Sequence, residues 1–259
     1  MHPVAQHEGV AGESVFTEAN TLALTTQSDG YYELVPSPES PELLQFEPEM
    51  LDEGLTIQRV VEGDELWDPA ERFVYRVFRT AGFCGHSPRE WVEETEPWRP
   101  GSTLHVVTDE NDVIVGVVRS ILAPFDGLPA SQFTPEIEVR EGLLCEIGSL
   151  AVQAAQRGLG VANELHKAAF QDGIIADVNG FCFLIDSWMF DFFRDVYGLP
   201  VQALAPPRRY MGGDVVPTAM WQPEMLEQVA RIRPRFYARF VEDIDPVLRA
   251  ELDLPIVLF

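Results

Sequence analysis

Runs of β-branched and aliphatic residues, separated by short polar turns, mark the strands of this chain. Residues 103–108 and 113–122 are two such runs, and the acidic turn 109–112 between them predicts an antiparallel hairpin. Residues 143–152 give the longest single strand, and 181–186 read as a buried strand because they are almost wholly apolar. The two closing strands predicted near the end of the domain are 201–204 and 215–221.

Apolar positions three and four residues apart predict helices in the remaining segments. Phe73, Val77 and Phe78 share one face of a helix that opens at Pro69 and ends at Gly82. The other predicted helices are 88–96, a long one that ends near 178, 188–197, and a C-terminal one from 223 to about 240. Strands and helices do not alternate regularly, so the order predicts an α+β fold with a mixed sheet.

The composition divides the chain into three parts. Residues 1–54 are acidic, contain Pro and Ser and have weak periodicity, which is typical of a partly irregular extension. Residues 55–222 hold the predicted strands and form the main domain, and residues 223–259 add a C-terminal helix. A hydrophobic content of 46% is sufficient for a sizeable core.

The charge and the cysteines restrict the possible partners and compartment. With a net charge of −24 and a pI near 4.4, the chain is a poor ligand for nucleic acid or an anionic membrane. Cys84, Cys145 and Cys182 are widely spaced, which argues against a disulfide framework and a zinc site. No apolar run reaches the ~18 residues that span a bilayer, and no signal peptide is recognisable. We expect a cytoplasmic protein.

A glycine-containing turn joins strand 143–152 to the long helix. Gly158 and Gly160 lack a Cβ, so the backbone can bend sharply and a ligand can approach it closely. The first N–H groups of the helix attract an anion, and Arg157 places a positive charge beside them. The sequence therefore predicts a phosphate or pyrophosphate site at this turn.

Three anion-binding patterns were weighed for this turn. A Walker A loop requires GxxxxGK[ST], and no Lys-Ser/Thr pair follows Gly158. The dinucleotide fingerprint GxGxxG is half met by Gly158 and Gly160, but Asn163 replaces its third glycine. The pattern [Q/R]xxGx[G/A] is met by Arg157, Gly160 and Ala162. An ordinary glycine-bearing helix start is the simplest alternative to all three.

Through the third pattern the chain resembles the GNAT superfamily of acyltransferases, in which this turn holds the pyrophosphate and pantetheine arm of an acyl thioester. Segments 73–78, 115–119, 146–152 and 205–213 are similar to successive blocks of acyl-homoserine lactone synthases and related long-chain N-acyl amino acid synthases. The resemblance covers roughly residues 70–222. It implies a GNAT-like, mostly antiparallel sheet flanked by helices, and acyl-CoA or acyl-pantetheine on a carrier protein as co-substrate.

The resemblance also implies which residues hold the acyl donor. A backbone N–H near 150–152, on a strand splayed from its neighbour, would stabilise the oxyanion of the tetrahedral intermediate. The implied cofactor-binding residues are Leu150, Val152, Arg157, Gly158, Leu159, Gly160, Val161 and Ala162.

Acyl transfer to an amine requires a base, and Glu146 is the candidate because partial burial beside the turn would raise its pKa. A structural ion pair of Glu146 with Arg119 or Arg76 is the alternative interpretation. The superfamily's usual acid for the leaving thiolate is a tyrosine four residues before the glycine that ends the late helix, and here that position is Arg194. The candidate substitutes are Tyr197, Ser187 and Tyr210, and Ser149 is a further catalytic candidate. Lactone synthases usually carry arginine at the position of Ser149, so amine acylation is expected rather than lactone formation.

The aromatic cluster over residues 181–193 indicates either plain core or a slot for a medium or long acyl chain, with Trp188 and Met189 as the candidate liners. Each buried CH₂ of an acyl chain would add about 0.8 kcal/mol to its binding free energy, so such a slot would favour a long chain. Arg208, in a Pro-flanked loop, is a candidate ligand of an acceptor carboxylate or a carrier-protein phosphate, although exposed arginines are more often plain surface.

Other candidates are weaker. Arg76 and Arg119 are further candidates for substrate binding. His105 and His166 are isolated and indicate no site, and no residue set indicates a metal.

The sequence thus predicts an N-acyltransferase that moves an acyl group from acyl-CoA or an acyl carrier protein to the amine of a small molecule such as an amino acid derivative. The acidic surface favours coenzyme A, because carrier proteins are themselves usually acidic. Two other classes stay open: a GNAT-like decarboxylase of a malonyl-type thioester, and a non-catalytic module that binds acyl thioesters. A homodimer is a further expectation.

Overall fold

The computed structural model describes residues 22–26, 32–36, 54–157 and 160–257. The chain divides into two units, residues 1–45 and 46–259. In the first unit, β1 (Leu22–Thr26) pairs antiparallel with β2 (Tyr32–Pro36), a hairpin that the weak periodicity of this segment did not predict.

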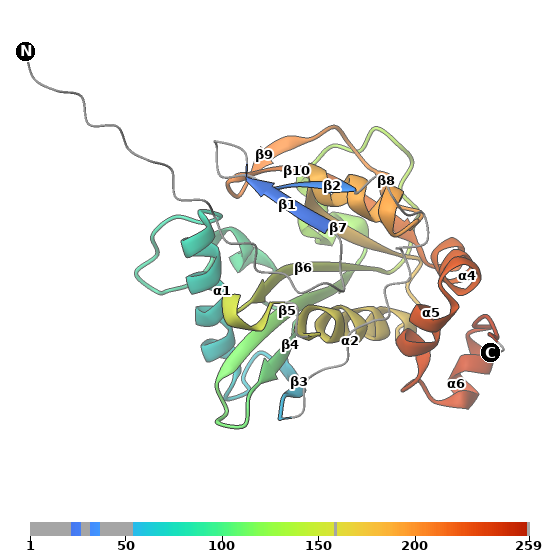
Figure 1. The fold of residues 1–259 in the computed structure, drawn as a ribbon, viewed down its shortest axis with the longest axis horizontal. Helices are drawn as coiled ribbons and strands as arrows, with labels where there is room; N and C mark the ends of the chain where they lie inside the picture. Colours follow the sequence, from blue (N-terminus) through green and yellow to red (C-terminus); the bar gives the residue numbers. More distant parts are fainter. Residues whose placement is uncertain (1–21, 27–31, 37–53, 158–159, 258–259) are drawn as a thin grey trace, which may run out of the picture. The chain divides into compact units, whose positions relative to one another are not determined.

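The second unit is built on an eight-stranded sheet (Figure 1). Its strands lie in the order β3 (Thr56–Val61), β4 (Ser102–Thr108), β5 (Ile114–Ala123), β6 (Leu144–Val152), β7 (Gly180–Asp186), β10 (Gly213–Trp221) and β8 (Gln202–Ala203), and β9 (Arg208–Tyr210) also pairs with β10. Every pair is antiparallel except β6 with β7, which is parallel. The predicted α+β fold with a mixed, mostly antiparallel sheet is confirmed.

Helices cover both faces of this sheet. They are α1 (Trp67–Ala81), α2 (Val161–Ile175), α3 (Ser187–Asp191), α4 (Gln222–Ile232), α5 (Pro234–Val241) and α6 (Pro246–Glu251). Short 3-10 turns η1 (Glu93–Trp98), η2 (Phe125–Gly127), η3 (Pro129–Gln132) and η4 (Ala154–Gln156) and the π turn η5 (Phe192–Val196) lie between the regular elements. Within the described residues, no helix is long and apolar enough to cross a membrane.

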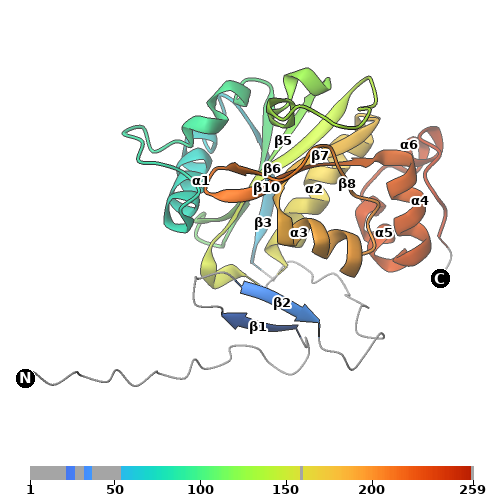
Figure 2. The ribbon, with the colours of Figure 1, turned by 90° about the horizontal axis from the view of Figure 1, so that it is seen from above.

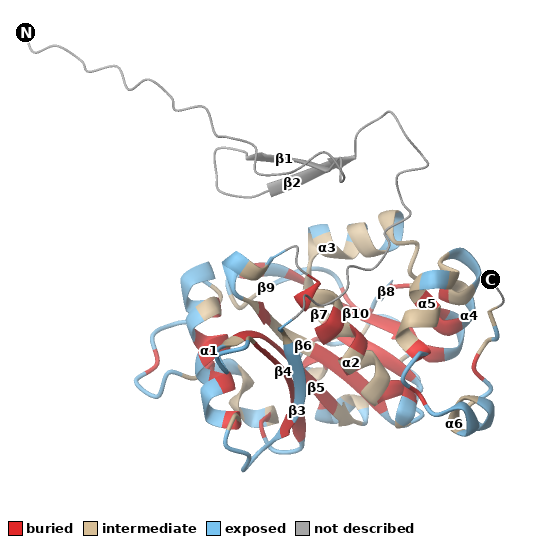
Figure 3. Ribbon diagram, turned by 60° about the horizontal axis from the view of Figure 1, so that its bottom comes forward, coloured by how far each residue is buried: buried red, intermediate tan, exposed pale blue. Residues whose placement is uncertain are grey.

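Alternate residues of β4 show how the layers form. Leu104 and Val106 pack in one buried cluster with the apolar face of α1, whereas Val107 packs in another cluster with α2, α4 and α5. Successive side chains of a strand point to opposite faces, so α1 and α2 lie on opposite sides of the sheet (Figure 2). Figure 3 shows that the buried residues line the central strands and the helix faces turned toward them.

Two predicted helices differ from the structure. The helix predicted over 88–96 is wrong, because Glu90 has a left-handed φ of 55° that a right-handed helix cannot continue through, and only η1 forms in this region. The single C-terminal helix predicted from 223 to 240 is two helices. Pro234 has no N–H to donate and restricts the preceding Arg233, whose φ of −140° ends α4.

Gly116 of β5 sets how closely α2 packs on the sheet. A Cβ added there would lie 2.6 Å from Cγ1 of Val161 and 2.9 Å from Cδ1 of Leu165, both in the first turns of α2. We expect Gly116→Ala to lower the free energy of unfolding by about 1–3 kcal/mol in a denaturant titration, because the start of α2 must shift outward. Gly148→Ala is the control, since nothing lies within 4 Å of its added Cβ; an equal loss in both variants would contradict this packing argument.

Candidate active site

The site begins where β6 and β7 part. These parallel strands are paired only at Leu144, Cys145 and Glu146, opposite Gly180 to Cys182, and beyond Glu146 strand β6 pairs with β5 alone. The splay between neighbouring strands, which the resemblance implied near 150–152, therefore opens after Glu146. It exposes the β7-facing backbone of the second half of β6.

A β-bulge at Ser149 bends β6 at this opening. Val117 pairs with Ala151 and Arg119 pairs with Gly148, so two residues of β6 lie opposite the single Val118 of β5. Ser149 takes a left-handed φ of 53°, which is uncommon for a residue with a Cβ. Bulges re-aim backbone groups, and strained backbone is concentrated at functional sites, so the Ser149 bulge is a candidate binding feature.

A cavity of about 240 Å³ fills the splay. β6 contributes Glu146 to Leu150, and β7 contributes Phe183 to Asp186 on the other side. The rest of its wall includes residues from the end of α1, η1, β5, α2 and η5, as well as Met189 and Tyr210. We call it the splay cavity.

Glu146 is the buried carboxyl of the splay cavity. The residue is only 3% exposed to solvent. Its Oε2 accepts a hydrogen bond from the backbone N–H of Ala130 at 2.8 Å. Burial raises the pKa of Glu146 to about 8, and the Ala130 hydrogen bond opposes this only in part. Glu146 is thus largely protonated at neutral pH and ionises close to it.

The alternative ion pair of Glu146 does not form among the described residues. Arg119 instead donates to Oε1 of Glu71 at 2.7 Å and to Oγ of Ser102 at 2.7 Å. Arg119 still reaches the wall of the splay cavity, and its Nε has no hydrogen-bond partner in the described part of the chain. Arg76 is exposed on α1 and lines neither of the cavities described here.

The glycine turn leads into α2 as the pattern predicted. Gly160 is the N-cap residue, with a left-handed φ of 74°, and α2 begins at Val161. Arg157 is exposed and forms no ion pair with a described residue, which leaves its charge available to a ligand. Gly158 and Leu159 lie outside the described residues. Val161 is buried against the sheet rather than facing the turn.

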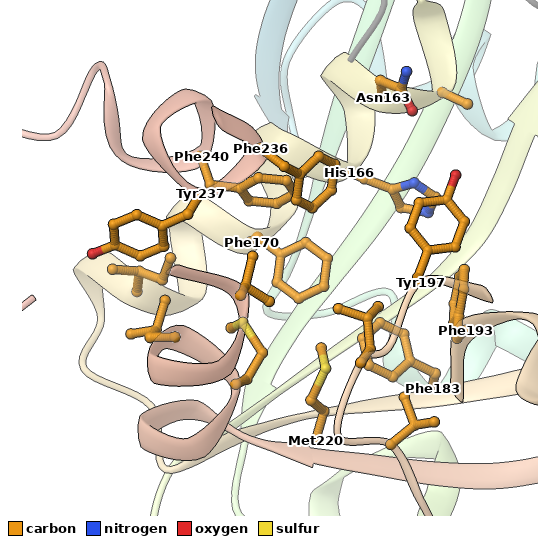
Figure 4. Close-up of a pocket in the computed structure, with 17 residues that line it drawn as sticks. Asn163, His166, Phe170, Phe183, Phe193, Tyr197, Met220, Phe236, Tyr237 and Phe240 are labelled. Carbon is orange, nitrogen blue, oxygen red and sulfur yellow. The ribbon is translucent and has the colours of Figure 1, made fainter. Parts of the chain in front are cut away.

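A second cavity, also about 240 Å³, lies on the α2 side of the sheet (Figure 4). Its wall is mostly apolar and comes from α2, β7, η5, β10, α4 and α5. Figure 4 shows Asn163, His166 and Tyr197 toward one end, with the rings of Phe170, Phe236 and Phe240 reaching the interior. We call it the apolar cavity.

Three residues, His166, Phe183 and Phe193, line both cavities and so form the wall where the two meet. His166 is the polar member, and desolvation lowers its pKa to about 4, so the imidazole is neutral at physiological pH. The sequence interpretation missed this residue. Helical spacing from Ala162 through His166 to Phe170 puts all three on one face of α2, and all three line the apolar cavity.

The remaining candidates are distributed between the two cavities and the surface. Met189 lines the splay cavity, whereas Trp188 is 47% exposed and lines neither cavity. Tyr197 lines the apolar cavity and not the splay cavity. Tyr210 lies in the wall of the splay cavity, 3.3 Å from Nε2 of Gln132.

Two other candidates, Arg208 and Ser187, line neither cavity. The Arg208 guanidinium stacks 4.1 Å from the ring centroid of Phe133 and donates to the carbonyl of Gln132. Ser187 donates to the carbonyl of Asp214. Within the residues that the structure describes, no group of three His, Cys, Asp or Glu side chains is placed to hold a metal ion.

The sequence profile of the family "N-acyl amino acid synthase FeeM" matches residues 69–220, more than half of the chain. The chain belongs to this family. It is therefore an N-acyltransferase, and both the predicted enzyme class and the predicted branch of the GNAT superfamily are confirmed. No curated protein is similar enough in sequence to match it.

Solved structures agree with this assignment at the level of the fold. FeeM, an N-acyl amino acid synthase from uncultured soil microbes, superimposes with a TM-score of 0.51 at 16% identity, over 67% of this chain and 94% of FeeM. TofI matches at 18% identity with a TM-score of 0.53, over 75% of this chain and 98% of its own. The acyl-homoserine lactone synthase BjaI matches at 14% identity with a TM-score of 0.52, over 80% of this chain and 93% of BjaI. These structures share the fold of this family member.

Proposed function

We propose that this enzyme transfers a medium- or long-chain acyl group from acyl-CoA to the amine of an amino acid or a related small molecule. The observation that carries the proposal is the pairing of two cavities: a splay cavity with a titratable carboxyl, and an apolar cavity that meets it at His166, Phe183 and Phe193. The first suits a reacting thioester and amine, and the second suits a hydrocarbon chain.

The turn before α2 is the proposed site for the coenzyme A pyrophosphate. Arg157 is exposed without an ion pair among the described residues, and the N–H groups at the start of α2 add their dipoles. A protein of net charge −24 repels anions in general, so this local charge supports phosphate binding here. A structural neighbour, BjaI, is described as CoA-dependent.

The proposed reaction uses Glu146 twice. Its carboxylate takes a proton from the nitrogen of the neutral acceptor amine as that nitrogen attacks the thioester carbonyl carbon. A backbone N–H of β6 near the Ser149 bulge donates to the resulting oxyanion. The C–S bond then breaks, and Glu146 returns the proton to the thiolate sulfur. A pKa of about 8 suits both steps, because a free thiol titrates near 8.5.

Arg119 is the proposed partner of an acceptor carboxylate. It lines the splay cavity, and its Nε has no partner within the described residues although Glu71 and Ser102 hold the two terminal nitrogens. Guanidinium groups bind carboxylates well because they offer several donors in one plane. The stacked position of Arg208 on Phe133 makes it a weaker candidate for this role.

The apolar cavity is the proposed site of the acyl chain. A volume of about 240 Å³ is far larger than the water-sized voids of an ordinary packed core and suits a hydrocarbon chain of several carbons. Each buried CH₂ adds about 0.8 kcal/mol, so a filled cavity would favour medium or long chains over acetyl by several kcal/mol.

The deciding experiment measures free thiol, CO₂ and product mass with acetyl-, malonyl-, octanoyl- and dodecanoyl-CoA and a mixture of amino acids. Amino acid-dependent thiol release with octanoyl- or dodecanoyl-CoA, and an amide of matching mass, is the expected result. Release of CO₂ from malonyl-CoA without amide formation would contradict it. Repeating the assay with the same acyl groups on a carrier protein decides between the two donors, and we expect coenzyme A. A homodimer and a cytoplasmic location stay predictions of the sequence.

A further inference from the structure

The apolar cavity is completed by a part of the chain outside the family match. The match ends at residue 220, and α4 and α5 follow it. These two helices contribute six residues to the cavity wall: Met225, Leu226, Val229, Phe236, Tyr237 and Phe240.

Aromatic rings form the part of this wall that comes from α5. The ring centroids of Phe236 and Phe240 are 4.5 Å apart, and Phe240 meets Phe170 of α2 edge to face at 5.3 Å. Figure 4 shows these three rings directed into the cavity. A wall of closely packed rings has little freedom to yield, because packed interiors resist small changes of volume.

Polar contacts fasten this wall to α2. Glu164, Lys167 and Gln171 lie on one stripe of α2, and each contacts α5 or the residues that follow it. Glu164 pairs with Arg239, Lys167 pairs with Asp243 at 2.6 Å, and Nε2 of Gln171 donates to the carbonyl of Phe240 at 2.9 Å. The neighbouring stripe of α2, with His166 and Phe170, faces the cavity. Helix α2 therefore begins at the turn proposed to bind the pyrophosphate, lines the apolar cavity and contacts the helix that forms its outer wall.

We propose that α4 and α5 set the upper limit of acyl-chain length in this enzyme, with Phe236 and Phe240 as the specificity-determining residues. The inference rests on the proposed function, because it assigns a limit to the chain that the apolar cavity takes. It makes the C-terminal helices a part of substrate selection in this chain.

The test compares kcat/KM for acyl-CoA donors from six to sixteen carbons in the full-length enzyme and its variants. In the native enzyme we expect kcat/KM to rise about fourfold per added CH₂ until the cavity is full, and then to fall. Phe240→Ala and Phe236→Ala should extend the rise by about two to four carbons, because each removes a ring from the wall. The ratio of kcat/KM for tetradecanoyl- to octanoyl-CoA should then increase at least tenfold.

Matched variants keep the result interpretable. Phe240→Leu retains an apolar side chain, so it should lengthen the optimal acyl chain by less than Phe240→Ala does. Val229→Phe adds a ring to the wall and should shorten the optimal acyl chain. Val247→Ala truncates an apolar residue of α6 that is 66% exposed and should leave the profile unchanged. An unchanged length profile in Phe236→Ala, Phe240→Ala and Phe240→Leu, with octanoyl transfer retained, would overturn this inference alone. Absence of transfer from every acyl-CoA in the native enzyme would instead overturn the proposed function.

Discussion

Replacing Glu146 with glutamine is expected to lower kcat for acyl transfer by about 10²–10⁴-fold, the usual contribution of a general base. Glutamine keeps the shape of the side chain and can still accept the hydrogen bond from Ala130, but it cannot take a proton from the amine. Steady-state assays of thiol release measure the loss. Binding of acyl-CoA, measured by calorimetry, should change little because the substitution leaves the turn before α2 unchanged.

The pH dependence of the native enzyme adds a second readout for the same residue. The base is active when ionised, so kcat/KM should rise with pH and level off above about 8, and Glu146→Gln should lack this rise. Stability should move in the opposite direction. The unfolded chain ionises Glu146 near its ordinary pKa of 4.5 whereas the folded chain holds the proton to about 8, so the free energy of unfolding falls as pH rises through that window.

Asp186→Asn is the matched control, because Asp186 is another carboxylate in the wall of the splay cavity and its pKa is also raised by burial. A loss confined to Glu146→Gln supports a role in proton transfer. Equal losses in both variants, or a Glu146→Gln enzyme that keeps the native pH profile, would show that Glu146 is not the base.

The second large effect is expected at Gly160. Gly160→Glu should weaken coenzyme A binding by at least about 100-fold, because it places a carboxylate at the N-terminus of α2, where the pyrophosphate is proposed to bind. Isothermal calorimetry or fluorescence titration with coenzyme A measures the change. The fold should persist, as judged by far-ultraviolet circular dichroism.

Backbone strain must be separated from charge in this experiment. Gly160 has a φ of 74°, so any side chain there costs about 1–2 kcal/mol. Gly160→Ala carries this strain without the charge, and Gly160→Gln adds the length of the side chain. We expect the three variants to bind coenzyme A in the order Ala, Gln, Glu, with Glu weakest. Native affinity in Gly160→Glu would remove the turn from the donor site.

Local sequence patterns were sufficient for the parts of the site that depend on consecutive residues. The turn before α2 was predicted from Arg157, Gly160 and Ala162, because a helix start and a left-handed glycine are properties of a short segment. The β4–β5 hairpin and β6 and β7 were found for the same reason, since each strand carries its own pattern of apolar residues. The order of these elements then fixed the α+β class.

The structure decided the features that require residues distant in the sequence. The helix predicted over 88–96 fails at Glu90, and the interpretation of Glu146 as an ion-pair partner of Arg119 fails because Glu71, 48 residues before Arg119, takes that place. His166 seemed isolated in the sequence because the residues that share its cavities lie on other elements.

The sequence by itself determined a local feature, since a glycine turn, a helix start and an arginine form the pattern of an anion site through local backbone geometry. Only the tertiary structure decided where the two cavities lie that we assign to the reaction and to the acyl chain. The splay of β6 from β7, the burial that raises the pKa of Glu146, and the wall that α5 adds to the apolar cavity all arise from packing between distant segments. Burial and cavity shape are properties of the assembled layers, and no single segment encodes them.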